Sequence, residues 1–297
     1  MSCISFEQFS FQAKEAVEKE LEQIINDLQA PEILKKSMQY SLQAGGKRIR
    51  PLLTFSVLAA LGVDWKKGTK VAAAVEMIHT YSLIHDDLPS MDDDDLRRGK
   101  PTNHKVYGEA IAILAGDALL THSFKVLSTL DRNRWTDAQI LELITGLSES
   151  SGAEGMVGGQ VADLLGENKQ LTIEELEFIH THKTGKLLAY SVDAGCILGN
   201  ASDELRQKLK TFSYHLGLAF QIRDDILDEE GDQERIGKPV GSDLSNKKST
   251  YPQLLTLEGA KEKLNYHINA SNQMIQDIPG DTTFLKTITD LIATRDH

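Results

Sequence analysis

The 297-residue chain has few cysteines, few prolines and few aromatic residues. Its two cysteines, Cys3 and Cys196, are too few for a disulfide framework or a thiolate metal site, and they favour a reducing cytoplasm. With only seven prolines, long stretches rich in Ala, Leu, Glu and Lys predict helices. The composition therefore argues against a disulfide-stabilised secreted domain.

Long hydrophobic runs are also absent from the sequence. No run approaches the ~18 apolar residues that a membrane-spanning helix needs, and the N-terminal segment lacks the basic-then-apolar order of a secretion signal. The net charge of −12 argues against nucleic acid as a partner. Anionic substrates are compatible with it, because bound divalent cations reverse the local sign of charge. We expect a soluble cytoplasmic protein that binds neither nucleic acid nor membrane.

Apolar residues recur at helical spacing along most of the chain. After an N-terminal helix ended by Pro31, the pattern predicts helices over about 31–44, 49–61, 71–87, 108–131, 136–152, 172–199, 203–229, 258–277 and 283–293. Glycine-rich Gly152–Gly159 and polar Gly231–Ser249 are expected to join helices. No sustained strand pattern and no linker interrupts the series. We therefore expect an all-α fold with one domain over residues 1–297.

The segment 84–104 contains the first of two acidic motifs. Asp86, Asp87 and Asp92–Asp95 place six carboxylates within ten residues. Two such charges about 4 Å apart repel by roughly 4 kcal/mol at an effective dielectric near 20. A solvated acidic loop is the plainer interpretation. However, Asp86 and Asp87 end an apolar helix, where negative charge opposes the helix dipole, and Arg97 and Arg98 follow with groups suited to phosphate.

The second acidic motif lies about 140 residues later, in the sequence FQIRDDILDEEGD. Asp224 and Asp228 are four residues apart and share a helix face, where like charges destabilise a helix unless a cation bridges them. Oxygen-only ligand sets suit Mg²⁺, which prefers one or two carboxylates plus water and substrate phosphates. Two such motifs on separate helices predict a magnesium–diphosphate site far more strongly than one does.

Basic residues supply the complement to these acids. Lys47, Arg48 and Arg50 stand at a predicted helix start after two glycines, where free N–H groups favour anions; an exposed basic turn is the alternative. His79 lies two turns before Asp86 on the same face, although a lone histidine on an apolar helix is as readily a core residue. Four lysines are weaker candidates for phosphate clamps: Lys183, Lys186, Lys238 and Lys248.

Taken together, these motifs resemble those of the trans-prenyl diphosphate synthases. The resemblance is carried by the two aspartate motifs, GGKRIRP, RRG, KTG, and GKPVGSD followed by KSTYP, and it covers the chain from about residue 30 to the terminal RDH. It implies a helical bundle around a deep central cavity, a homodimer, and two or three Mg²⁺ ions. Within that family, the chain most resembles the bacterial enzymes that form a fifteen-carbon product.

The resemblance also implies a role for each matched residue. The Mg²⁺–diphosphate site would use Asp86, Asp87, Asp92, Asp224, Asp225 and Asp228, with Asp86 and Asp92 as the first motif's direct ligands. The allylic diphosphate would be held by Arg97, Lys183, Thr184, Gln221 and Lys238, with Lys248 as a weaker addition. Isopentenyl diphosphate would be held by Lys47, Arg50, His79 and Arg98.

The expected reaction joins isopentenyl diphosphate to dimethylallyl and then geranyl diphosphate, giving farnesyl diphosphate and free diphosphate. Tyr81 and Ser82, roughly 6–7.5 Å before Asp86 along the helix, would close the product pocket, although Tyr81 alone could be an ordinary core aromatic. Three alternatives remain open. They are a geranylgeranyl diphosphate synthase, a terpene cyclase (which generally has an Asn/Ser/Glu second metal motif), and a non-catalytic regulatory subunit.

Overall fold

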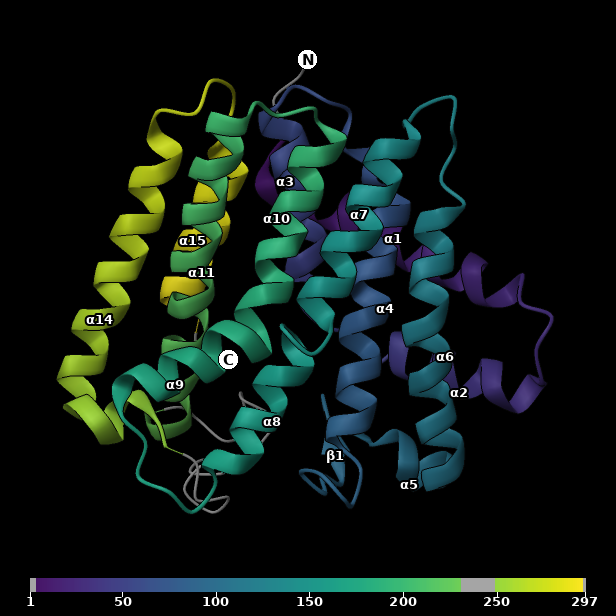
Figure 1. Ribbon diagram of the computed structural model, residues 1–297, viewed down its shortest axis with the longest axis horizontal. Helices are drawn as coiled ribbons and strands as arrows, with labels where there is room; N and C mark the ends of the chain where they lie inside the picture. Colours follow the sequence, from purple (N-terminus) through teal and green to yellow (C-terminus); the bar gives the residue numbers. More distant parts are fainter. Residues whose placement is uncertain (1–3, 231–248, 296–297) are drawn as a thin grey trace. The chain divides into compact units, whose positions relative to one another are not determined.

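The computed structural model describes residues 4–230 and 249–295. Contacts between residues divide the chain into two compact units, each with its own set of packed helices (Figure 1). Unit 1 comprises Met1–Phe55 and Asp64–Ile144, and unit 2 comprises Ser56–Val63 and Thr145–His297. The single domain expected from the sequence stays a prediction.

Unit 1 is organised around a buried central helix, α4, which packs against α6 and α1. The side chain of Ser5 caps α1, whose buried residues recur every four positions from Phe9 to Ile25 and form one apolar face. Close contact between α4 and α6 depends on Gly116, because a Cβ there would lie 2.1 Å from the His85 ring. The elements are α1 (Phe6–Asn26), α2 (Glu32–Leu42), most of α3 (Ile49–Ala60), η1 (Trp65–Gly68), α4 (Thr69–Asp86), β1 (Leu96–Arg97), β2 (Lys100–Pro101), α5 (Asn103–Tyr107), α6 (Glu109–Ser128) and the first half of α7 (Asp137–Ser151).

Unit 2 is organised around the long helix α11, which packs against α14 and α10. The elements of unit 2 are the ends of α3 and α7, α8 (Met156–Gly166), α9 (Ile173–His180), η2 (Thr181–Gly185), α10 (Lys186–Leu198), α11 (Asp203–Glu230), α14 (Tyr251–Gln276) and α15 (Thr283–Thr294). In Figure 1, α9 crosses in front of α11, and α14 runs alongside it. The short segment η2 is a π-helix that lies in contact with α8, α10 and α11.

The prediction of an all-α fold is confirmed, since the described residues contain no strands beyond the two-residue pair β1 and β2. Several helix assignments need correction. The segment 172–199 is helical from Ile173 to Leu198 as predicted, but the π turn η2 divides it into α9 and α10. The expected joint at Gly152–Gly159 leads directly into α8. Helix α14 begins at Tyr251 rather than near residue 258, and it carries a kink at Thr256. Local periodicity cannot reveal a π turn, because the one extra residue shifts the apolar pattern only slightly.

Helix α6 differs from the sequence expectation in another respect. Among the described residues it is the one helix whose length and composition would allow it to cross a membrane, with a mean hydropathy of 1.4 over an 18-residue window. It packs against α4, α2 and α5 within unit 1. Its outer face leaves Ile113 and Leu114 exposed.

Candidate active site

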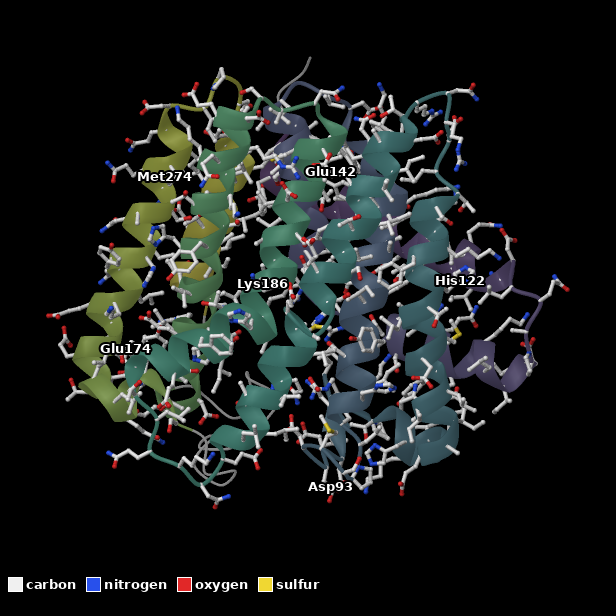
Figure 2. The ribbon with its side chains drawn as sticks, viewed as in Figure 1. Asp93, His122, Glu142, Glu174, Lys186 and Met274 are labelled. Carbon is white, nitrogen blue, oxygen red and sulfur yellow. The ribbon has the colours of Figure 1, made fainter. Side chains whose placement is uncertain are left out.

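The first acidic motif lies at the carboxyl end of α4 in unit 1. Asp86 is the last residue of the helix, and the chain turns back so that the Asp92 N–H donates to the Asp86 carbonyl at 2.9 Å. Both side chains are half-buried. Asp93, by contrast, is exposed at the outer edge of this loop (Figure 2). The turn therefore brings the backbones of Asp86 and Asp92 together despite their separation in sequence.

Asp87 in the same motif is directed inward. Only 3% of the residue is exposed, and its Oδ1 accepts hydrogen bonds from Arg97 Nε at 2.6 Å and Arg97 Nη2 at 2.5 Å. Arg97 also contacts Asp94 at 3.2 Å. Although burial opposes its charge, these carboxylates raise the pKa of Arg97 above its usual value. Asp87 and Arg97 thus form a buried ion pair behind the motif.

The RRG sequence forms a hairpin turn that was not predicted from the sequence. Arg98 and Gly99 connect β1 to β2, and both have positive φ angles, of 54° and 73°, as a two-residue type I′ turn requires. Arg98 Nη1 donates to the Gly45 carbonyl. Gly46 leaves room for this contact, because a Cβ at that position would lie 2.6 Å from the Arg98 guanidinium. The glycine pair, which lies just beyond the end of α2 at Leu42, therefore accommodates the Arg98 side chain.

A basic cluster surrounds His79 in unit 1. Burial, together with the charges of Arg50, Arg98, Arg97 and Arg48, holds the pKa of His79 well below 6.5. The imidazole is therefore neutral at pH 7. Several positive charges in one small region form a favourable place for a diphosphate anion.

Within the GGKRIRP motif, the three basic residues have different surroundings. Arg48 is 3% exposed and donates to Glu76 Oε1 at 2.7 Å and to the Leu42 carbonyl at 2.5 Å. Lys47 and Arg50 are half-buried. Arg48 therefore has a structural role, whereas Lys47 and Arg50 are the basic members of the motif that solvent reaches.

Tyr81 lies inside unit 1 on α4. It is 6% exposed, and its ring meets the His85 ring edge-on with centroids 5.7 Å apart. Burial and the nearby charge of Asp86 raise its pKa to about 12, so the phenol stays neutral. The Ser82 hydroxyl donates to the His79 carbonyl at 2.9 Å and is held within the helix.

The second acidic motif lies near the carboxyl end of α11 in unit 2. Gln221, Asp224 and Asp228 follow one another at spacings of three and four residues, which places them along one half-buried helix face. Asp225, at the edge of this face, is buried and only 5% exposed. Its Oδ2 accepts from the Tyr251 N–H at 2.9 Å and lies 3.3 Å from His180 Nε2.

The KTG sequence lies on the π segment η2, a type of distortion often found at functional sites. Lys183 Nζ donates to Asp163 Oδ2 of α8 at 2.6 Å. The segment fits closely between two helices, because a Cβ on Gly159 would lie 2.1 Å from the Lys183 nitrogen and one on Gly217 would lie 3.2 Å from the Gly185 Cα. Asp163 was missed in the sequence because α8 was not predicted.

Arg295, just beyond α15, was also missed as a partner of the second motif. Its Nη2 donates to Asp224 Oδ1 at 2.5 Å and to the Phe220 carbonyl at 2.8 Å, and its guanidinium lies 4.0 Å from the Phe220 ring centre. Arg223 in turn donates to the Arg295 carbonyl at 2.9 Å. No local sequence signal connects a residue near the C-terminus to an aspartate about 70 positions earlier.

The predicted site residues thus form one group in each unit. Unit 1 contains Lys47, Arg50, His79, Tyr81, Ser82, Asp86, Asp87, Asp92, Arg97 and Arg98, and unit 2 contains Lys183, Thr184, Gln221, Asp224, Asp225 and Asp228. Lys238 and Lys248 lie outside the described residues. In residues 4–230 and 249–295, no three His, Cys, Asp or Glu side chains gather so as to hold a metal ion by themselves. The donor set is nevertheless rich in carboxylate oxygen, which suits Mg²⁺ once phosphate oxygens are added.

Comparison with known proteins places the chain among prenyl synthases. The polyprenyl synthetase family profile matches residues 31–280. The chain is 58% identical over 297 residues to the farnesyl diphosphate synthase of Geobacillus stearothermophilus, covering 100% of both chains. It is 57% identical to that of Bacillus subtilis (strain 168), covering 96% of each. The crystal structure of geranylgeranyl pyrophosphate synthetase from Pyrococcus horikoshii matches with a TM-score of 0.89 and 28% identity, covering 98% of each chain.

Proposed function

Because the chain belongs to the polyprenyl synthetase family, we propose that it is an Mg²⁺-dependent farnesyl diphosphate synthase. It joins isopentenyl diphosphate first to dimethylallyl and then to geranyl diphosphate, with release of diphosphate at each step. The similarity to two bacterial farnesyl diphosphate synthases at 57–58% identity supports this activity. One observation of the structure supports it most. Both acidic motifs keep their first and last aspartates half-buried, while the second aspartate is anchored inward by a basic side chain.

The oxygen ligands for Mg²⁺ are proposed to be Asp86 and Asp92 in unit 1, with Asp224 and Asp228 in unit 2. Two or three bound ions would neutralise the charge that develops on the leaving diphosphate. Asp87 and Asp225 were also expected as ligands from the sequence. Their inward contacts with Arg97 and His180 lead us to assign them to holding the motifs instead.

The remaining polar residues are proposed to divide between the two substrates. Lys47, Arg50, His79 and Arg98 hold isopentenyl diphosphate, supported by the basic cluster around a neutral His79. Arg97, Lys183, Thr184 and Gln221 hold the allylic diphosphate, with Lys238 and Lys248 as further candidates from the sequence.

The reaction begins when the carbon–oxygen bond of the allylic diphosphate breaks and its electron pair leaves with the diphosphate. Cationic side chains that bind the developing negative charge more strongly than the ground state lower the barrier. The double bond of isopentenyl diphosphate then supplies two electrons for the new carbon–carbon bond, and a proton is lost from the adjacent carbon. The departing diphosphate is the proposed acceptor of that proton. An apolar pocket keeps water from the cation.

Tyr81 is the proposed limit on product length. Replacing this buried ring with a methyl group in Tyr81→Ala would leave room for further elongation, so products longer than fifteen carbons are expected. Chromatography of products from labelled isopentenyl diphosphate measures the change. Tyr107→Ala is a suitable control, because it also removes a tyrosine from unit 1 but changes α5, where Tyr107 packs on Tyr40. An unchanged product profile for Tyr81→Ala would reject this role.

We also propose that the enzyme is a cytoplasmic homodimer that uses the outer face of α6. Ile113 and Leu114 expose 42% and 53% of their surface on this helix, and a second copy would cover them. Ile113→Asp should shift the protein toward monomer in size-exclusion chromatography with light scattering. A wild-type protein that is already monomeric would exclude the dimer.

Assay of the purified chain with Mg²⁺, dimethylallyl diphosphate and labelled isopentenyl diphosphate tests the main proposal. A fifteen-carbon diphosphate should form, and EDTA should abolish its formation. A twenty-carbon product would favour the geranylgeranyl alternative, which the Pyrococcus similarity keeps relevant. Hydrocarbon release from farnesyl diphosphate alone would indicate a cyclase. Absence of condensation without an added partner would indicate a regulatory subunit.

A further inference from the structure

One buried carboxylate oxygen in unit 2 connects three helices. Asp225 Oδ2 of α11 lies 3.3 Å from Nε2 of His180, the last residue of α9. The same oxygen accepts the N–H of Tyr251, the first residue of α14, at 2.9 Å. The His180 and Tyr251 rings also stack, with centroids 5.7 Å apart and an angle of 16° between their planes. His180 is 9% exposed and Asp225 is 5% exposed, so water contributes little to this arrangement.

His180 and Asp225 each lie next to residues assigned to the substrate site. His180 immediately precedes η2, which carries Lys183 and Thr184. Asp225 lies between Asp224 and Asp228 in the sequence and is buried, whereas those two aspartates are half-buried. The close approach of Gly217 to Gly185 leaves little freedom between α11 and η2. A small rotation of either element would therefore move Lys183 relative to the two aspartates.

Stability alone does not account for a polar pair at this place. Well-packed apolar residues of similar volume are often as stabilising as a buried ion pair, or more so. A hydrogen-bonded pair differs from an apolar contact in being directional, because it defines the rotation of each helix as well as the distance between them. Directional control is useful where two helices must present groups to one ligand.

We propose that His180 is a positioning residue, which acts through Asp225 to hold the α11 aspartates in register with the lysine-bearing segment η2. The ligand that needs this register is the allylic diphosphate with its Mg²⁺, so the inference rests on the proposed function. His180 itself does not touch the substrate. Its loss should therefore affect the allylic side of the reaction and leave the binding of isopentenyl diphosphate unchanged.

Three substitutions of His180 separate positioning from packing. His180→Phe keeps a ring against Tyr251 but removes the group that bonds Asp225, and His180→Asn is too short to reach it. Both should lower kcat by roughly 10- to 100-fold, the range expected when a supporting partner is lost. Both should also raise the Mg²⁺ half-saturation and the KM for geranyl diphosphate, with the KM for isopentenyl diphosphate within about twofold of wild type. His180→Gln retains a donor of similar reach and should recover at least half of kcat.

A matched control is available two residues away. His182 lies in η2 but stacks on Phe178 and bonds its carbonyl, so His182→Asn should leave all four parameters near wild type. The double variant His180→Phe/Asp225→Asn should have a kcat only slightly lower than that of His180→Phe alone, because both substitutions remove the same hydrogen-bonded pair.

The proposal is overturned if a folded His180→Phe or His180→Asn protein loses thermal stability but keeps wild-type kinetics. It is equally overturned if folded His180→Gln is as impaired as His180→Asn, which would indicate direct action of the imidazole on the substrate. Circular dichroism decides which variants are folded, and each folded variant tests the proposal by itself. Failure of the wild-type chain to form any product would instead reject the proposed function.

Discussion

Two enclosed histidines, His79 in unit 1 and His180 in unit 2, lie beside the two acidic motifs and have opposite pKa shifts. Burial lowers the pKa of both. Around His79, Arg50 and other arginines lower it further. Around His180, Asp225 and other carboxylates outweigh burial, so that its pKa is raised. The charges packed around each ring therefore shift the pKa of the same residue type down in one unit and up in the other.

The acidic motifs show a parallel contrast. In unit 1 the inward aspartate is held by Arg97, which is permanently charged, and in unit 2 by a histidine, which can lose its proton. The first motif follows a helix end and closes through a backbone hydrogen bond, whereas the second lies within the continuous helix α11. Two different local structures therefore present the same pattern of two outward carboxylates and one inward carboxylate.

The largest expected effect comes from removing an outward carboxylate in either unit. Asp86→Asn and Asp224→Asn should each lower kcat by about 10³-fold or more, because the charge on the leaving group loses much of its stabilisation. Steady-state assays with geranyl and isopentenyl diphosphates measure the loss. If one variant retained near-wild-type activity, the two motifs would not be equivalent.

Exposed acids close to each motif serve as controls for that experiment. Asp93→Asn introduces asparagine, which like aspartate tolerates the positive φ of 51° at this position. Glu229→Gln changes an exposed side chain on α11. Both controls should keep activity within about twofold, since surface substitutions away from special contacts have small effects.

The next largest effect is on stability and should differ between the units. Asp87→Asn leaves Arg97 partly buried with a charge it cannot lose, so we expect a loss of about 3–5 kcal/mol in the free energy of unfolding. Asp225→Asn leaves a histidine that can become neutral and bond an amide, so the loss should be about 1–3 kcal/mol. Urea unfolding of both proteins measures the difference. Equal losses would show that the kind of basic partner does not matter.

A third histidine extends the comparison to a site where no carboxylate contributes. His267 in α14 bonds His215 Nδ1 at 2.9 Å, and burial, His215 and Lys263 lower its pKa to about 4. Because the folded-state pKa is below the unfolded value near 6.5, its neutral form contributes stability that is present above pH 6.5 and lost as pH falls toward 4. The free energy of unfolding measured in urea should decrease over this interval, by on the order of 1 kcal/mol after solvent screening. His267→Phe should flatten that part of the curve, and an unchanged slope would contradict the assignment.

The smallest effect concerns Arg295, which places a positive charge on Asp224 in unit 2. Arg295→Gln removes this charge and should lower the Mg²⁺ half-saturation by a few-fold at most, since partly exposed ion pairs contribute only about 0–1 kcal/mol. Titration of activity with Mg²⁺ measures the shift. An increase in half-saturation would mean that Arg295 supports metal binding rather than competing with it.

Much of this molecule follows from its sequence. The nearly continuous apolar composition of α4 and the Asp-rich segment that follows it predict a buried helix ending in carboxylates, because local composition determines both features. The GGKRIRP, KTG and DDILD motifs likewise predict the chemistry of the site, since the residue types themselves define which ligands suit them. The family resemblance drawn from these motifs agrees with the comparisons.

The tertiary structure decided which of those residues face outward and which are used internally. Asp86 and Asp87 are neighbours of the same type, yet Asp86 is half-buried while Asp87 is buried and accepts a hydrogen bond from Arg97. Likewise, Arg48 is buried against Glu76 while Arg50 is reached by solvent. The contacts of Asp163, His180 and Arg295 join residues 20 to 71 positions apart. Sequence determined the kinds of charge available. Only folding decided which charged residues pair with each other. Burying an unpaired charge is costly, and the partner that neutralises it comes from another helix.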